Sequence, residues 1–240
     1  MIIGISGKIG SGKDTVGKII QYFTLSKYSI VRTNQLTFIN CTDADLNESN
    51  WQIKKFAGKL KQVVSVLTGI SIEDLEKEEV KNSYLPDNWN SFTNEFGLHN
   101  IKTKHRYTVR EFLQKIGTDA LRNVIHPNIW VNALFADYKP TDRRTMQDPD
   151  DSNIEYPSWI ITDVRFSNEA KAVRDRDGIL IRVDSKFIDH KNKITRVDFF
   201  DDHESETALD NFNFDYYIDN SSTLDKLVNN VHLILKETIL

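Results

Sequence analysis

A glycine-rich segment near the N-terminus constrains the fold of this 240-residue chain more than any other feature. Residues 7–15 are GKIGSGKDT, which fits the pattern G-x-x-x-x-G-K; an apolar run at 2–6 precedes them and a helical pattern starts near residue 13. Glycines permit backbone conformations in which several N–H groups converge on one phosphate, and the N-terminus of the following helix adds positive partial charge. We therefore expect a phosphate-binding loop between a buried strand and a helix.

The residue types in this loop suggest individual roles. Lys13 brings a full positive charge to the β- and γ-phosphates of a nucleotide. Asp14 stands where the common pattern has Ser or Thr, and the hydroxyl comes one position later, at Thr15. Asp14 is therefore expected either to hold Mg²⁺, directly or through water, or to orient an acceptor phosphate. The candidate nucleotide-binding residues are Gly10, Ser11, Gly12, Lys13, Asp14 and Thr15. The alternative is a glycine turn that caps a helix without any ligand.

A second group of candidate residues follows the apolar run 159–162, which ends at Asp163. In open parallel sheets, ligands gather at the carboxyl edge, where such a carboxylate lies close to Mg²⁺. Arg165 and Glu169 come just after it, and we expect both to face the same pocket. The alternative is that they form an ordinary surface ion pair four residues apart on a helix. The phosphate-binding loop in the same chain favours the functional interpretation.

A third group consists of Arg110, Gln114 and Trp130. An arginine can bind phosphate through two parallel hydrogen bonds, and a tryptophan can stack on a base. The pattern alone favours a simpler interpretation, in which Trp130 belongs to the core and Arg110 is a solvated helix residue. The lysines at 54, 55, 59 and 61 likewise favour a solvated helix face over phosphate contacts.

Apolar patterns along the chain alternate between strands and helices. Strands are expected at 2–6, 29–32, 159–162, 178–183 and 216–218, and helices at 13–25, 51–68, 108–125, 127–138, 167–176 and 224–236. This alternation predicts an α/β fold of the P-loop type, a parallel sheet with helices on both faces. We expect one domain over 1–240, with a helical substrate-binding insertion at about 40–140 and a lid at about 185–203. Residues 40–50, 78–106 and 139–157 are expected to be irregular.

Composition excludes several other classes of protein. The formal net charge of −4 argues against a protein that grips the nucleic-acid backbone. The single cysteine, Cys41, excludes an intramolecular disulfide and is typical of a reducing cytoplasm. No apolar run approaches the roughly 18 residues of a membrane span, so no membrane association is expected. His203 with Glu204 and Glu206 lacks a zinc-binding spacing, so no structural metal is expected.

Five blocks, from residue 4 to about 211, resemble the phage-type deoxynucleoside monophosphate kinases. They are GKIGSGKDT, FAGKLKQVVSVLTG, TVREFLQKIGTDALRNVIHPNIWVNAL, WIITDVRFSNEA and DHESETALDN. The third and fourth blocks are more specific than the first, which other small-molecule kinases share. The resemblance implies transfer of the γ-phosphoryl group of ATP, with Mg²⁺, to a dNMP, giving dNDP and ADP. It also implies a viral source and therefore action in the host cytoplasm. The sequence itself is compatible with a homodimer but does not determine the oligomeric state.

The resemblance assigns roles to the candidate residues. Lys13, Asp14 and Arg165 would act in catalysis, and Arg110 would contact ATP. The acceptor would be bound by Gln114, Trp130, Asp163, Arg165 and Glu169, with Trp130 near the base and Glu169 near the sugar. Mg²⁺ would be held by Asp14, Thr15 and Asp163, directly or through water. The alternatives are a P-loop kinase acting on dephospho-coenzyme A or a ribonucleotide, and a nucleotide switch without enzymatic activity.

Overall fold

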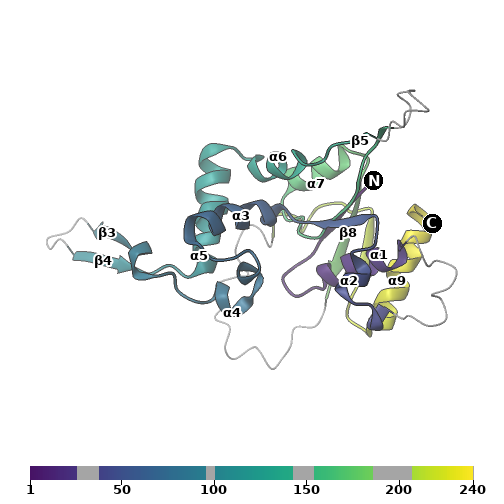
Figure 1. Ribbon diagram of the computed structural model, residues 1–240, viewed down its shortest axis with the longest axis horizontal. Helices are drawn as coiled ribbons and strands as arrows, with labels where there is room; N and C mark the ends of the chain where they lie inside the picture. Colours follow the sequence, from purple (N-terminus) through teal and green to yellow (C-terminus); the bar gives the residue numbers. More distant parts are fainter. Residues whose placement is uncertain (26–37, 96–100, 143–153, 186–206, 240) are drawn as a thin grey trace. The chain divides into compact units, whose positions relative to one another are not determined.

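The computed structural model describes residues 1–25, 38–95, 101–142, 154–185 and 207–239 (Figure 1). This part of the chain divides into two compact units, one made of Met1–Phe56 and Leu134–Leu240 and the other of Ala57–Ala133. The expected strand at 29–32 and nearly all of the expected lid at 185–203 lie outside the described residues.

The first unit is built on a five-stranded parallel sheet, which confirms the predicted α/β class. The strands are β1 (Ile2–Ser6), β2 (Trp51–Lys54), β7 (Ser158–Ile161), β8 (Ile179–Asp184) and β9 (Tyr216–Asp219), in the spatial order β2-β7-β1-β8-β9. The chain leaves β1 toward β2, whereas it leaves the adjacent strand β7 toward β8. The connections that follow these two neighbouring strands therefore run in opposite directions along the sheet, and in open α/β sheets ligands bind at the carboxyl ends of strands at such a point.

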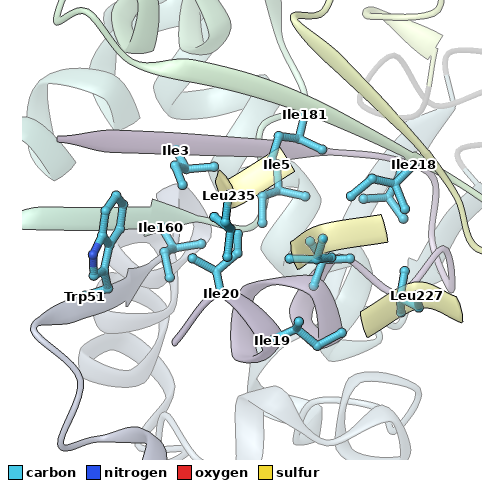
Figure 2. Close-up of a cluster of buried hydrophobic side chains, with 13 residues drawn as sticks. Ile3, Ile5, Ile19, Ile20, Trp51, Ile160, Ile181, Ile218, Leu227 and Leu235 are labelled. Carbon is cyan, nitrogen blue, oxygen red and sulfur yellow. The ribbon is translucent and has the colours of Figure 1, made fainter. Parts of the chain in front are cut away.

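Successive side chains of β1 point to opposite faces of the sheet, and helices pack on each face. Ile3 and Ile5 face α1 (Lys13–Phe23) and α9 (Leu224–Thr238), and Figure 2 shows side chains of both helices directed toward them. Gly4 faces the opposite layer, where a Cβ would lie only 2.8 Å from the Leu180 side chain. Each fully buried isoleucine contributes roughly 1.5–3 kcal/mol, so the core fixes the strand from which the phosphate-binding loop extends.

The second unit consists mostly of helices and has a core of its own. Its elements are α3 (Phe56–Thr68), η3 (Asp74–Glu76), α4 (Glu78–Lys81), η4 (Asp87–Trp89), β3 (Ser91–Glu95), β4 (Ile101–His105), α5 (Val109–Gln114), the wide helix η5 (Lys115–Ile125) and the start of α6 (Ile129–Phe135). The core contains Val64, Leu75, Leu85, Val109 and Leu113. The predicted helix at 108–125 is present as α5 and η5. Its predicted capping box is present too, because Thr108 Oγ1 accepts from the Glu111 amide at 3.1 Å and the Glu111 carboxylate accepts from the Thr108 amide at 2.7 Å.

The prediction of one helix over 51–68 was wrong at its beginning. Residues Trp51–Lys54 form β2, and helix α3 begins only at Phe56. Ile53 fits a helical face and a strand equally well, and the parallel pairing of β2 with β7 decides between them.

The segments expected to be irregular also contain short elements. These are η2 (Phe38–Asn40), α2 (Asp43–Leu46), the antiparallel β3–β4 pair and the short pair β5 (Thr141–Asp142) with β6 (Ile154–Glu155). Thr42 explains α2, because its hydroxyl and the Asp45 carboxylate form a capping box. In the described ranges, no helix combines the length and the apolar character that crossing a bilayer requires.

Candidate active site

The first unit gathers polar side chains at the carboxyl ends of its parallel strands. Gly7 directly follows β1, Lys55 follows β2, Thr162 and Asp163 follow β7, and Asn220 follows β9. Since all five strands are parallel, these residues belong to one edge of the sheet.

The phosphate-binding loop has the backbone that its glycines allow. Gly10 and Gly12 have φ angles of 80° and 94°, in the left-handed region that residues with a side chain rarely adopt. Gly12 is the N-cap residue of α1 (Lys13–Phe23), and it has no side chain that could accept a hydrogen bond from the first N–H groups of the helix. Ser11 is 3% exposed, and its buried Oγ has no hydrogen-bond partner. An uncapped helix N-terminus beside an unsatisfied buried hydroxyl fits a phosphate group.

Lys13 lies in the first turn of α1, and its ammonium bends back onto the loop. Nζ donates to the carbonyl oxygens of Gly7 and Lys8, both at 2.6 Å. Burial lowers the pKa of Lys13 to about 8, and the positive charge of Arg165 acts in the same direction. The carboxylates of Asp14 and Asp163 act against this shift. The ammonium is therefore a desolvated charge for which an anionic ligand would be a strong partner.

Asp14, in the first turn of α1, is held by donors from the residues that directly follow β7 and β2. Thr162 Oγ1 donates to Asp14 Oδ1 at 2.6 Å, and Lys55 Nζ lies 3.0 Å from Oδ1 and 3.1 Å from Oδ2. Burial raises the pKa of Asp14, but the hydrogen bond from Thr162 and the charge of Lys55 outweigh it, so the pKa is lowered. Asp14 is thus a fixed, ionised carboxylate next to Lys13.

Asp163 is anchored to the beginning of α3. Its Oδ1 accepts a hydrogen bond from the Phe56 amide at 2.8 Å. Mg²⁺ usually binds through one or two carboxylates together with phosphate oxygens and water. Asp14 and Asp163 offer carboxylates of the kind that Mg²⁺ binds. Among the residues that the structure describes, no group of three or more His, Cys, Asp or Glu side chains gathers as a metal site, either at this edge or in another part of the fold.

Glu169 is 2% exposed and caps α7 (Ser167–Arg174). Its Oε2 accepts hydrogen bonds from the backbone amides of Arg165 at 2.9 Å and Phe166 at 3.1 Å. The carboxylate thereby fixes the turn that carries Arg165. The side chain of Arg165 is half-buried, and its positive charge helps to lower the pKa of Lys13, after the larger effect of burial.

The other three candidate residues belong to the second unit. Arg110 forms an ion pair with Glu78, and its Nε donates to Asn82 Oδ1 at 3.3 Å. Gln114 is half-buried at the end of α5. Trp130 is only 6% exposed, and its Nε1 donates to the carbonyl of Gly117 at 2.8 Å.

Sequence reasoning missed two polar residues of this edge, Thr162 and Asn220, and it favoured a solvated helix face for a third, Lys55. Asn220 Nδ2 donates to the Ser11 carbonyl at 2.9 Å, while its own amide donates to the Asp184 carbonyl at 2.7 Å. All three residues directly follow a strand of the parallel sheet: Lys55 follows β2, Thr162 follows β7 and Asn220 follows β9. The rule that ligands bind at the carboxyl edge would have selected them, had the strand ends been assigned correctly.

A parallel sheet whose connections leave β1 and β7 in opposite directions, a glycine loop that leads into a helix, and a half-buried lysine beside two carboxylates together form an α/β arrangement like that of P-loop kinases. Residues 43–231 match the family model of deoxynucleotide monophosphate kinases, and the chain belongs to this family.

Two viral proteins are similar to this chain over most of its length. A protein of Acanthamoeba polyphaga mimivirus, whose name provisionally assigns it as a deoxynucleotide monophosphate kinase, is 25% identical over 239 residues, covering 96% of this chain and 94% of its own. The deoxynucleoside-5′-monophosphate kinase of Escherichia phage T5 is 25% identical over 236 residues, covering 87% and 85%.

Proposed function

We propose that this protein transfers the γ-phosphoryl group of ATP to the 5′-phosphate of a deoxynucleoside monophosphate, in the cytoplasm. The observation that carries the proposal is the desolvated ammonium of Lys13 beside an uncapped helix N-terminus and two carboxylates. Family membership supports the kinase chemistry and the acceptor class.

The phosphate-binding loop is the proposed site for the donor. The backbone amides at the beginning of α1 and the unsatisfied Oγ of Ser11 suit the β-phosphate. Lys13 is proposed to exchange its carbonyl acceptors for the β- and γ-phosphate oxygens, where its charge follows the charge that develops during transfer.

Asp14, Thr15 and Asp163 are the residues proposed to hold Mg²⁺, directly or through water. When bound, Mg²⁺ would neutralise charge on the β- and γ-phosphates. The contact of Asp14 with Thr162 and that of Asp163 with Phe56 fix both carboxylates before any ligand arrives.

The reaction needs little covalent assistance from the protein. An oxygen of the acceptor phosphate attacks the γ-phosphorus, and the bond from that phosphorus to the β,γ-bridging oxygen breaks, leaving ADP. Since the acceptor phosphate is already an anionic nucleophile, no general base is required. The protein must instead align two polyanions and offset their repulsion, which the positive charges of Lys13 and Arg165 do.

The acceptor contacts are proposed for Asp163, Arg165 and Gln114, and a donor contact for Arg110. Glu169 is buried as a cap of α7, which supports an indirect role through the turn that carries Arg165. The burial of Trp130 and its bond to Gly117 support a packing role beside the base site rather than stacking on the base.

An acceptor panel tests the proposed function. ADP formation from MgATP is measured with dAMP, dCMP, dGMP, dTMP, the corresponding ribonucleotides and dephospho-coenzyme A. Fast turnover restricted to some or all of the deoxynucleotides is expected. Turnover with dephospho-coenzyme A or ribonucleotides alone would instead identify another P-loop kinase. ATP binding without turnover on any acceptor would favour a nucleotide switch.

A further inference from the structure

The carboxylate of Asp14 presents an electrostatic problem for the proposed site. It stands where the common loop has a neutral hydroxyl, and it therefore adds a negative charge to a site that must bind two phosphate-bearing ligands. A phosphate monoester alone carries about −1.5 to −2 charges at pH 7. A site with this residue needs a nearby cation that serves both the carboxylate and the incoming phosphate.

Lys55 supplies such a cation at short range. Its Nζ lies 3.0 Å from one oxygen of Asp14 and 3.1 Å from the other, and Thr162 occupies the first of these oxygens as well. The side chain of Lys55 is 29% exposed, so the ammonium is partly desolvated while still accessible. A cation in this state interacts more strongly with a phosphate than one in bulk water.

The backbone at Lys55 is also fixed to the site. Lys54 accepts a hydrogen bond from the Thr162 amide at 3.2 Å, and the Phe56 amide donates to Asp163 at 2.8 Å. Lys55 therefore sits between two residues that are tied to the carboxyl end of β7. The adjacent Lys54 directs its ammonium elsewhere, 5.3 Å from the centre of the Trp159 ring.

We propose that Lys55 is a catalytic residue that binds the 5′-phosphate of the acceptor, with Asp14 and Thr162 as its positioning residues. This inference rests on the proposed kinase function. The strand order assigns the ligand: the phosphate-binding loop follows β1, whereas Lys55 follows β2, on the far side of β7. Lys55 thus contacts Asp14 from the end of a strand that is separated from β1 by β7. We assign the acceptor to this side, because the acceptor must attack the γ-phosphorus in line, opposite the leaving ADP.

Steady-state kinetics of Lys55→Met, Lys55→Arg and the control Lys54→Met test the assignment. Lys55→Met is expected to lower kcat/KM for the dNMP by about 100-fold, with the Kd for MgATP changed by less than about 3-fold. Lys55→Arg keeps the charge and should recover activity to within about 10-fold of wild type. Lys54→Met removes the same charge from the neighbouring residue and should behave like wild type.

A double variant separates phosphate binding from simple neutralisation of Asp14. If Lys55 only neutralised Asp14, the variant Asp14→Asn/Lys55→Met would regain the dNMP KM of Asp14→Asn. We expect its KM to stay at least about 10-fold higher. Equal KM values for these two variants, or a Lys55→Met effect confined to the Kd for MgATP, would overturn the proposal.

Equilibrium binding of the dNMP to wild type and Lys55→Met keeps this test independent of turnover. Weaker binding to the variant supports Lys55 as a ligand of the acceptor, and equal affinity overturns it. A wild-type protein that binds dNMP through Lys55 but does not phosphorylate it would refute the proposed function and leave the binding assignment in place.

Discussion

The side-chain amide of Asn220 donates a hydrogen bond to the carbonyl of Ser11 at 2.9 Å, across 209 residues of sequence. The contact joins the end of β9 to the phosphate-binding loop. A Cβ at Gly12 would lie 2.5 Å from Asn220 Nδ2, so the two segments are closely packed. Asn220 therefore holds the loop in the conformation that its glycines permit.

Asn220→Ala is expected to weaken ATP binding without unfolding the protein. Loss of one hydrogen bond costs about 0.5–1.5 kcal/mol, which corresponds to a rise of roughly 2- to 13-fold in the Kd for ATP. Isothermal titration calorimetry measures this change. Asn229→Ala, on the exposed side of α9, is the matched control and should leave the Kd unchanged.

ATP binding should take up a proton at Lys13 near pH 8. Burial lowers the pKa of Lys13 from 10.5 to about 8 in the free protein, and a bound polyanion raises it again. Affinity should then fall as pH rises above 8, approaching about tenfold per pH unit. Calorimetry at pH 8 in two buffers of different ionisation enthalpy gives the number of protons taken up, and proton release would contradict this account.

The same shift affects the stability of the free protein. The pKa of Lys13 is lower in the folded state than in the unfolded state, because burial disfavours the charged form. Below pH 8 the folded protein therefore bears the whole free-energy cost of burying this charge. This cost disappears as pH rises toward 10.5. The difference in unfolding free energy between Lys13→Met and wild type should therefore shrink over this window. A constant difference from pH 7 to 10 would show that Lys13 is not buried as a charge.

Glu169→Ala should destabilise the first unit. The substitution removes the acceptor of two backbone amides at the beginning of α7, at a cost of about 2–4 kcal/mol. Glu169→Gln retains a carbonyl acceptor and should cost only about 1 kcal/mol. Urea denaturation measures both values, and Glu237→Ala, exposed near the end of α9, is the control. If Glu169→Ala were as stable as the wild type but had a changed preference between deoxyribose and ribose, a direct contact of Glu169 with the sugar would be supported instead.

Thr162→Val should reduce turnover through Asp14. Valine has nearly the same shape but cannot donate to Asp14 Oδ1, so the carboxylate loses one of its two fixed donors. We expect kcat to fall about 10-fold while the melting temperature stays within a few degrees. Normal kcat would show that the orientation of Asp14 is not set by Thr162.

The sequence predicted those parts of the fold and the site that depend on local chemistry. The strand, the glycine loop and the helix after it form a continuous pattern, and the Thr108 capping box involves residues three apart. The role of Lys55 could not be predicted, because a helix over 51–68 would have placed it on a solvated face. Only the pairing of β2 with β7, more than 100 residues later, places it beside Asp14. The role of Asn220 also depends on a contact between distant parts of the sequence, because its partner Ser11 lies near the other end of the chain, and it could not be predicted either.

Transfer of label from [γ-³²P]ATP to a dNMP tests the central claim most directly. Wild-type protein is expected to place the label on the terminal phosphate of dNDP, and Lys13→Ala to lower kcat by at least about 100-fold while remaining folded. Labelled dNDP formed at a near-normal rate by Lys13→Ala would contradict the role of Lys13. No labelled dNDP from wild-type protein with any deoxynucleotide would contradict the proposed function itself.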